Sequence, residues 1–184
     1  MALKYKITDQ TEMYFVTFTV VGWVDVFIRE SYREIFVSSI KYCQENKGLQ
    51  VYAWVLMTSH AHLIIGTAGI YRLEDIIRDL KSFTSRKLRL EMEKCSYESR
   101  KDWMMHLFYK AGTYNTNNKD YQFWIQDNHP IQLSSGEMLM QRLNYLHNNP
   151  VEAGFVYQPE YWKWSSACDY YTGQQGLIDV ILVV

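Results

Sequence analysis

The chain has 184 residues, of which 48% are hydrophobic and 21% are charged, a balance typical of one ordinary globular domain. Its formal net charge of −1 excludes a strongly basic protein that binds nucleic acid through its overall charge. The 3 separated cysteines, the lack of a signal-peptide pattern and the lack of a long apolar run predict a cytoplasmic protein that does not enter a membrane.

The first half of the chain predicts three strands and two helices. Residues 14–21 are rich in β-branched and aromatic residues and predict a strand. Residues 29–46 have apolar positions near helical spacing and predict a helix. Residues 51–57 and 60–66 predict two strands joined by a short turn, as in a hairpin. Residues 73–94 predict a long amphipathic helix that carries the densest basic stretch of the chain.

The second half is less regular. Residues 97–110 continue the helical pattern, 111–120 predict a polar loop, and 121–125 predict a short strand. A Ser-Ser-Gly-Glu start and an Asn-Asn-Pro end delimit a helix over 138–149. Residues 177–184 predict a last strand. The order β-α-β-β-α-β-α predicts one α+β domain over the whole chain, with a ferredoxin-like antiparallel sheet and helices on one face of it.

Two histidines mark the third predicted strand. His60 and His62 are two residues apart, so both side chains point to the same face of the sheet. Two imidazoles in this arrangement can share one metal ion, although a catalytic site needs at least one further ligand. The structural alternative is a pair of histidines with satisfied hydrogen bonds on a half-buried strand.

The helix over 138–149 offers partners for these histidines. Tyr145 and Asn149 are four residues apart and therefore lie on the same side of the helix. A tyrosine hydroxyl can act as a nucleophile, and an amide oxygen can complete the ligand shell of a hard metal. His147 and His129 are nearby alternative ligands, although His147 faces another side of the helix. One tyrosine among 15 is by itself more often a core or surface residue.

The His-x-His strand followed by this tyrosine helix resembles the HUH single-stranded-DNA endonucleases that have one tyrosine. Residues 145–154 (YLHNNPVEAG) resemble the tyrosine helix and the following Asn-Pro-Val of the IS200-like transposases, specifically the REP-associated tyrosine transposases. Further similar stretches are AWVLM at 53–57, FWIQ at 123–126 and WSS at 164–166. The resemblance spans residues 14–170, and the small Ala61 between the histidines departs from the usual bulky residue.

The resemblance implies the HUH endonuclease fold and a metal-dependent transposase that nicks and joins single-stranded DNA. His60, His62 and Asn149 would hold one Mg²⁺ or Mn²⁺ ion, which acts as a Lewis acid on the scissile phosphate. Tyr145 would attack that phosphate, release a 3′-hydroxyl and form a 5′-phosphotyrosine intermediate that a second 3′-hydroxyl can resolve.

The implied partner is single-stranded DNA with hairpin elements of the REP type, bound by a homodimer or by a monomer. Basic side chains would hold its phosphates, and Trp124 would stack on a base. A core role is the better interpretation of Trp124, and a solvated helix face is the usual interpretation of the basic residues in the helix over 73–94. The candidate DNA-binding residues are Arg78, Lys81, Arg86, Lys87, Trp124 and Arg142. The alternatives are a domesticated hairpin-binding protein without catalysis and a hydrolytic metal-dependent nuclease.

Overall fold

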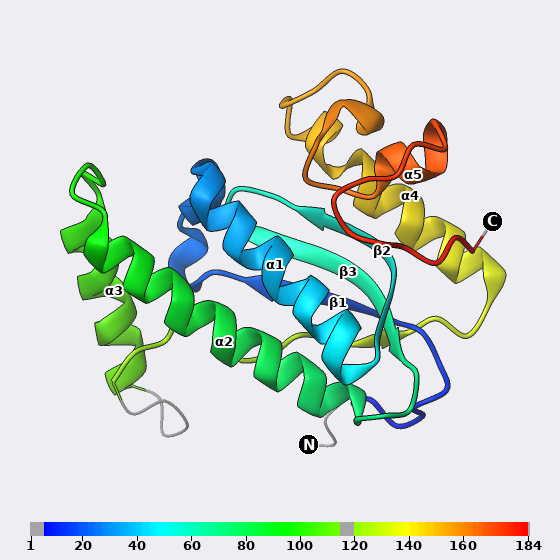
Figure 1. Ribbon diagram of the computed structural model, residues 1–184, viewed down its shortest axis with the longest axis horizontal. Helices are drawn as coiled ribbons and strands as arrows, with labels where there is room; N and C mark the ends of the chain where they lie inside the picture. The colour runs from blue at the N-terminus through cyan, green and yellow to red at the C-terminus, as the bar shows by residue number, and fades with distance from the viewer. Residues whose placement is uncertain (1–5, 115–119, 184) are drawn as a thin grey trace.

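The computed structural model describes residues 6–114 and 120–183 of the chain. A four-stranded antiparallel sheet with the order β2-β3-β1-β4 lies at its centre (Figure 1). The strands are β1 (Tyr14–Thr19), β2 (Leu49–Leu56), β3 (His60–Thr67) and β4 (Ile131–Gln132). This strand order is that of the ferredoxin-like pattern, so the predicted fold class is confirmed.

Helices connect and cover the strands. The α-helices are α1 (Glu30–Lys47), α2 (Leu73–Lys94), α3 (Lys101–Thr113), α4 (Gly136–Glu152) and α5 (Ala167–Tyr171). The 3₁₀ turns are η1 (Val21–Trp23), η2 (Val26–Ile28) and η3 (Pro159–Tyr161). Among the described residues, none of these helices has the length and the apolar composition needed to cross a bilayer.

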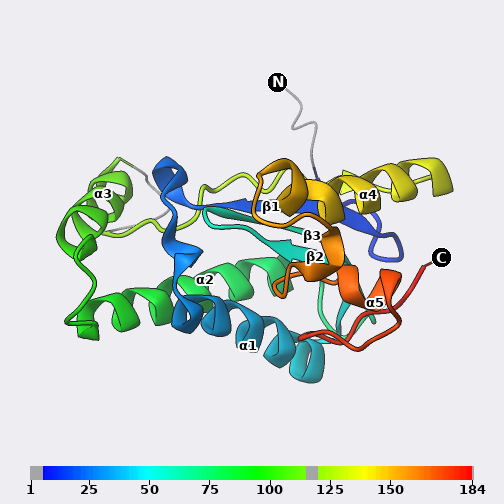
Figure 2. The ribbon, with the colours of Figure 1, turned by 90° about the horizontal axis from the view of Figure 1, so that it is seen from above.

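The helices cover both faces of the sheet, so the prediction that they lie on one face was wrong. Helices α1 and α2 pack on one face and α4 lies on the other (Figure 2). The central strand β3 explains the two layers, because alternate residues of a strand point in opposite directions. Leu63 belongs to the core beneath α1 and α2, whereas Ile64 belongs to a second apolar cluster beneath α4. Each apolar face needs its own cover.

Two predicted elements between α2 and α4 differ from the structure. The helical pattern over 97–110 belongs to the separate helix α3, and residues 115–119 of the predicted loop lie outside the described residues. The strand predicted over 121–125 does not form. Only Trp124 bridges to Val20, and β4 follows further along the chain. Because Phe123 and Trp124 are both buried, this segment lacks the alternating exposure of a half-buried strand.

Two predictions near the C-terminus also differ from the structure, namely the end of the helix over 138–149 and the last strand. Helix α4 continues past Pro150 to Glu152. A proline lacks the N–H donor of one helical hydrogen bond, but its carbonyl can still accept one, and here it accepts from the amide of Phe155 at 2.9 Å. The strand predicted over 177–184 is absent from the described part of that segment. Ile181 instead donates a single backbone hydrogen bond of 2.9 Å to Val51.

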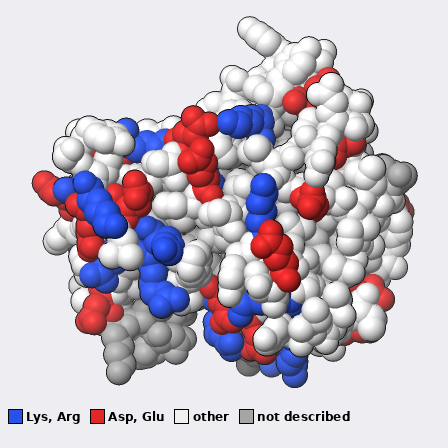
Figure 3. Space-filling model, viewed as in Figure 1, with Lys and Arg blue, Asp and Glu red and all other residues white. Residues whose placement is uncertain are grey.

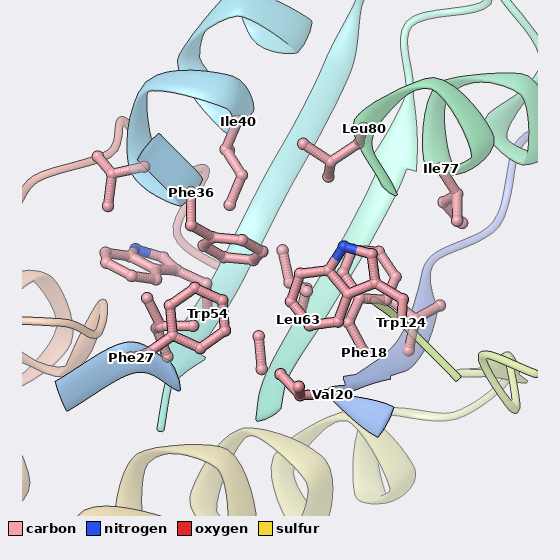
Figure 4. Packing of buried hydrophobic residues seen from close by; sticks show 14 of the residues in the cluster. Phe18, Val20, Phe27, Phe36, Ile40, Trp54, Leu63, Ile77, Leu80 and Trp124 are labelled. Carbon is pink, nitrogen blue, oxygen red and sulfur yellow. The ribbon is translucent and has the colours of Figure 1, made fainter. Parts of the chain in front are cut away.

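Trp124 is a core residue. Its side chain is 4% exposed and stacks on Phe27, with the ring centroids 5.7 Å apart (Figure 4). The indole N–H donates to the Thr84 hydroxyl at 2.9 Å, so the buried donor is satisfied. The core role is therefore confirmed, and the ring has no open face on which a base could stack.

Replacing Trp124 by alanine should lower the free energy of unfolding by about 3–5 kcal/mol, because the change leaves a large cavity in the core. Urea denaturation measures this loss. Trp103→Ala is the matched control, since the Trp103 ring is exposed on α3 and its removal should change stability by about 0.5 kcal/mol or less. Equal losses in the two variants would contradict the core role.

Candidate active site

Strand β3 carries His60 and His62 on the face that α4 covers. The two ring centroids are 4.9 Å apart. In the sheet register, His62 lies opposite Thr17 of β1 and His60 lies opposite Thr19. The predicted shared face of the histidines is therefore confirmed.

His62 is oriented by the neighbouring strand. Its Nδ1 lies 2.9 Å from the Thr17 hydroxyl, whereas its Nε2 is buried and has no hydrogen-bond partner among the described residues. Burial, together with the nearby charges of His60 and Arg142, lowers the pKa of His62 to about 3. The imidazole is therefore neutral at pH 7. When Nδ1–H donates to Thr17, the Nε2 lone pair is unpartnered, which is the state of a histidine that binds a metal.

His60 contacts the helix. Burial lowers the pKa of His60, while a hydrogen bond with the Asn149 side chain and the nearby Asp25 carboxylate raise it. The Ser59 hydroxyl lies 3.3 Å from His60 Nδ1. The hydrogen bond between His60 and Asn149 joins β3 to α4 and places the amide of Asn149 beside the first histidine.

Tyr145 lies one helical turn before Asn149. Its ring centroid is 5.3 Å from that of His62, with the two planes at 62°, and its side chain is 41% exposed. Arg142 lies one turn earlier still, with its guanidinium 5.2 Å from the centre of the Phe15 ring. The structure thus brings together the predicted nucleophile, the predicted ligands and one predicted cation. The hydroxyl-bearing ring remains open to solvent.

His147 holds the tyrosine helix in place. It is buried, and its Nε2 lies 2.9 Å from the Ser166 hydroxyl, which also accepts a 3.0 Å hydrogen bond from the backbone N–H of Trp54 in β2. Burial lowers the pKa of His147 to about 4, so this ring is also neutral at pH 7. The alternative that His147 is a metal ligand is therefore wrong, because its nitrogen is used in a buried contact away from β3. The second alternative, His129, lies 3.5 Å from the Asp127 carboxylate.

The residues present fit a divalent metal. Among the described residues, no three His, Cys, Asp or Glu side chains cluster as a metal site. The available donor set is instead two imidazoles and one amide. The buried, unpartnered Nε2 of His62 is the observation that favours a ligand role, since a buried polar atom without a partner is costly.

A basic groove runs between α2 and the segment over 121–130. Its volume is about 890 Å³. The cations that line it are Lys6, Arg72, Arg78, Lys81, Arg86 and Arg89. The groove reaches β1 on the side where β4 pairs, opposite the side where β3 carries the histidines, because the amide of Thr17 donates to the carbonyl of Asn128 at 3.1 Å.

The predicted DNA-binding cations differ in their surroundings. The Lys81 ammonium donates to the Ile125 carbonyl at 2.6 Å and to the Asn128 side chain, and burial lowers its pKa to about 8. Arg78 forms ion pairs with two aspartates of its own helix. Lys87 lies over the Phe83 ring and is not among the residues that line the groove. Of the predicted cations that line the groove, Arg86 is the one with neither an ion pair nor a hydrogen bond to a described residue.

The surface seen in Figure 3 mixes both signs of charge, in keeping with the near-neutral composition. The positive side chains gather mainly at one end and along the lower border of that view. Positive charge is therefore local rather than general.

The family model described as "Transposase IS200 like" matches residues 13–126, which include both histidines. The chain belongs to the IS200-like transposase family. The match ends before α4, so the assignment of Tyr145 and Asn149 depends on the geometry above.

The fold is similar to that of a solved REP-associated tyrosine transposase bound to a REP hairpin. The two chains share 15% identity with a TM-score of 0.63, covering 100% of this chain and 94% of the other. A weaker match, with 16% identity and a TM-score of 0.41, is a putative transposase from Deinococcus radiodurans R1, covering 80% of this chain and 94% of the other. A comparison with curated proteins gives no match.

Sequence reasoning missed three residues of this transposase site. The sequence contained a signal for Thr17, because this polar residue lies on the same face of β1 as the buried Phe15. Ser166 lies in the WSS stretch that resembles the family, but nothing in a single sequence shows that it contacts His147. Trp23 had no signal, because nothing in the sequence shows that it lies next to His60.

The free energy of unfolding should fall as the pH drops from 6.5 towards 4, partly because of His147. The unfolded chain binds a proton near pH 6.5, whereas the folded chain binds it only near pH 4, so protons favour the unfolded state between these values. The contribution of this residue approaches about 1.4 kcal/mol per pH unit. Urea unfolding across pH 4–8 measures the slope. His147→Gln should reduce the slope below pH 6.5 and leave it unchanged between pH 7 and 8, whereas identical slopes would contradict a neutral buried His147.

Proposed function

We propose that this IS200-like transposase is a metal-dependent endonuclease and strand transferase that acts on single-stranded DNA next to hairpins. The observation that carries the proposal is the approach of Tyr145 to His62, with a ring-centroid distance of 5.3 Å between residues that are 83 positions apart in the chain. The similar fold of a REP-associated transposase bound to a REP hairpin supports hairpin DNA as the partner.

The chemistry assigned to Tyr145 is transesterification. Its hydroxyl oxygen attacks the scissile phosphorus, the bond from phosphorus to the 3′-oxygen breaks, and that oxygen leaves as a 3′-hydroxyl with the proton that tyrosine loses. The 5′-phosphate remains on the tyrosine. A 3′-hydroxyl from another strand reverses the step, frees the tyrosine and joins the new ends. The half-exposed ring suits this role, because a long polymer must reach the hydroxyl.

His60, His62 and Asn149 would hold a divalent ion, Mg²⁺ or Mn²⁺, which would supply Lewis-acid polarisation of the scissile phosphate. Thr17 fixes the ring of His62 through Nδ1 so that Nε2 faces the site. Asn149 contacts His60 and so ties the spacing of the ligands to the position of the helix.

The DNA path follows the basic groove to the edge of β1. Arg86 in the groove contacts phosphates of the hairpin side, and Arg142 beside Tyr145 contacts the phosphate that is cleaved. Lys81 acts indirectly, because its ammonium holds the segment over 125–128 against α2.

Tyr145→Phe should abolish covalent attachment of the protein to DNA, because phenylalanine has no hydroxyl to attack phosphorus. The measurement uses labelled single-stranded oligonucleotides from the repeats that flank the gene, with Mn²⁺ or Mg²⁺, followed by a denaturing gel. The wild type should give a labelled protein band that the variant lacks, at unchanged thermal stability.

His62→Ala tests the metal in the same assay and should lower adduct formation by at least about a hundredfold, because loss of a ligand should cost at least as much as the upper range for loss of a residue that only supports a ligand. Cleavage without a protein band would indicate hydrolysis instead. Hairpin binding without cleavage under either metal would contradict the enzyme proposal and favour a non-catalytic binding protein.

Arg86→Glu should weaken hairpin binding by about tenfold and reduce the dependence of log Kd on log salt by about one unit, because a phosphate contact is lost. Lys87→Glu is the matched control, with the same change of charge one residue away but outside the groove. Fluorescence anisotropy at several salt concentrations measures both. Equal effects of the two variants would show that the groove does not direct the DNA.

A further inference from the structure

Trp23 is an exposed aromatic residue beside the histidines. Its side chain is 61% exposed, and its ring centroid lies 5.4 Å from that of His60, with the planes at 67°. The rings of Trp23, His60, His62 and Tyr145 form a continuous row of edge contacts. Trp23 lies at one end of this row and the nucleophile lies at the other.

The backbone of Trp23 is held on both sides. Val20 donates to the Ser59 carbonyl at 2.9 Å and Phe27 donates to the Thr58 carbonyl at 2.8 Å, so the turn is fastened to the start of β3. Val24 follows directly and is buried. The exposed position of the Trp23 ring is therefore set by a fixed loop rather than by a free end.

The conformation of Trp23 is unfavourable for its residue type. Its φ is +55° and follows Gly22 at +68°, so both residues are in the left-handed region. A bulky side chain rarely adopts this conformation, and such residues persist where the surrounding structure enforces them, often at functional sites. Trp23 is exposed and its backbone conformation is unfavourable, so neither core packing nor backbone preference explains a tryptophan here. An exposed hydrophobic ring also gains no stability from its contact with water.

We propose that Trp23 is a stacking platform for an unpaired base of the DNA strand next to the scissile phosphate. The inference rests on the proposed function, since it places that phosphate between Tyr145 and the histidines. A single strand whose scissile phosphate lies there passes Trp23 at the far end of the ring row. The bases of this strand are unpaired, so they can present their π faces to the tryptophan. Stacking on an exposed aromatic ring is the way proteins hold such bases without reading their sequence.

The platform would position the strand rather than react with it. The Trp23 ring has no group that can transfer a proton to phosphate, and its N–H is only a donor. Its effect is therefore on binding and on the register of cleavage, because a base held at Trp23 sets which phosphate lies opposite Tyr145.

The test is a thermodynamic cycle on binding. Trp23→Asn is made in the Tyr145→Phe background, and affinity for the flanking-repeat oligonucleotides is measured with EDTA present so that cleavage plays no part. The loss should be at least about fivefold, the effect of removing one base stack. With an abasic nucleotide at the stacked position the two proteins should bind equally, and a scan of abasic positions along the single strand locates that position.

Two controls separate a platform from a structural role. Asparagine tolerates the left-handed region, so Trp23→Asn should keep or raise the Tm, and Trp23→Tyr should retain most of the affinity. Tyr42→Ala removes a ring of similar exposure, 52%, from α1 on the other face of the sheet and should leave affinity unchanged.

The outcomes separate the two proposals. Full affinity of Trp23→Asn, or a loss that no abasic position removes, would overturn the platform and leave the nuclease proposal intact. A sharp fall in Tm would also overturn it, because the ring would then be a packing element. No binding of any hairpin oligonucleotide by the Tyr145→Phe protein would contradict the proposed function, and the platform with it.

Discussion

The position of β3 between two covered faces is the constraint on which the site depends. A central strand covered on both sides leaves its polar side chains little water, so each imidazole is stabilised by being neutral or by finding a partner. His62 is neutral and uses Thr17 from the adjacent strand, while His60 uses Asn149 from the helix above. One nitrogen of His62 is left without a partner among the described residues, and this unsatisfied atom is the reason that we propose His62 as a metal ligand.

The second constraint is the placement of α4. A helix on an apolar sheet face can slide or rotate with little loss of hydrophobic contact, because the hydrophobic effect is non-directional. The buried contact from His147 through Ser166 to the Trp54 backbone is directional and selects one position. Since Tyr145 is two residues away on the same helix, the contact that fixes His147 also fixes the distance from Tyr145 to β3.

Electrostatics in this chain are arranged locally. A net charge of −1 and the acidic partners of several basic side chains leave little general attraction for DNA. What remains is a groove whose cations adjoin the edge of β1, together with Arg142 at the tyrosine. Such an arrangement favours binding at one place over binding along any duplex. In the proposed function, aromatic contacts would then be a larger share of the affinity, and the exposed Trp23 would contribute one of them.

Much of this protein followed from the sequence alone. The period of two placed His60 and His62 on one face, and the period of 3.6 placed Tyr145 above Asn149. The motifs around these residues resembled the family that the match confirms. These features are local, because strand and helix periods act over a few residues. Even here the local signal failed at Pro150, which ends many helices but lies within α4.

Only the tertiary structure decided which elements meet. No local pattern shows that α4 lies on the opposite face from α1 and α2, that Trp124 is buried while Trp23 is exposed, or that Ser166 anchors His147. The reason is physical: such contacts join residues far apart in the chain, and their energies depend on how whole faces pack together. The sequence by itself determined the candidate site residues and their local spacing, and the packing of two layers on one sheet determined their approach.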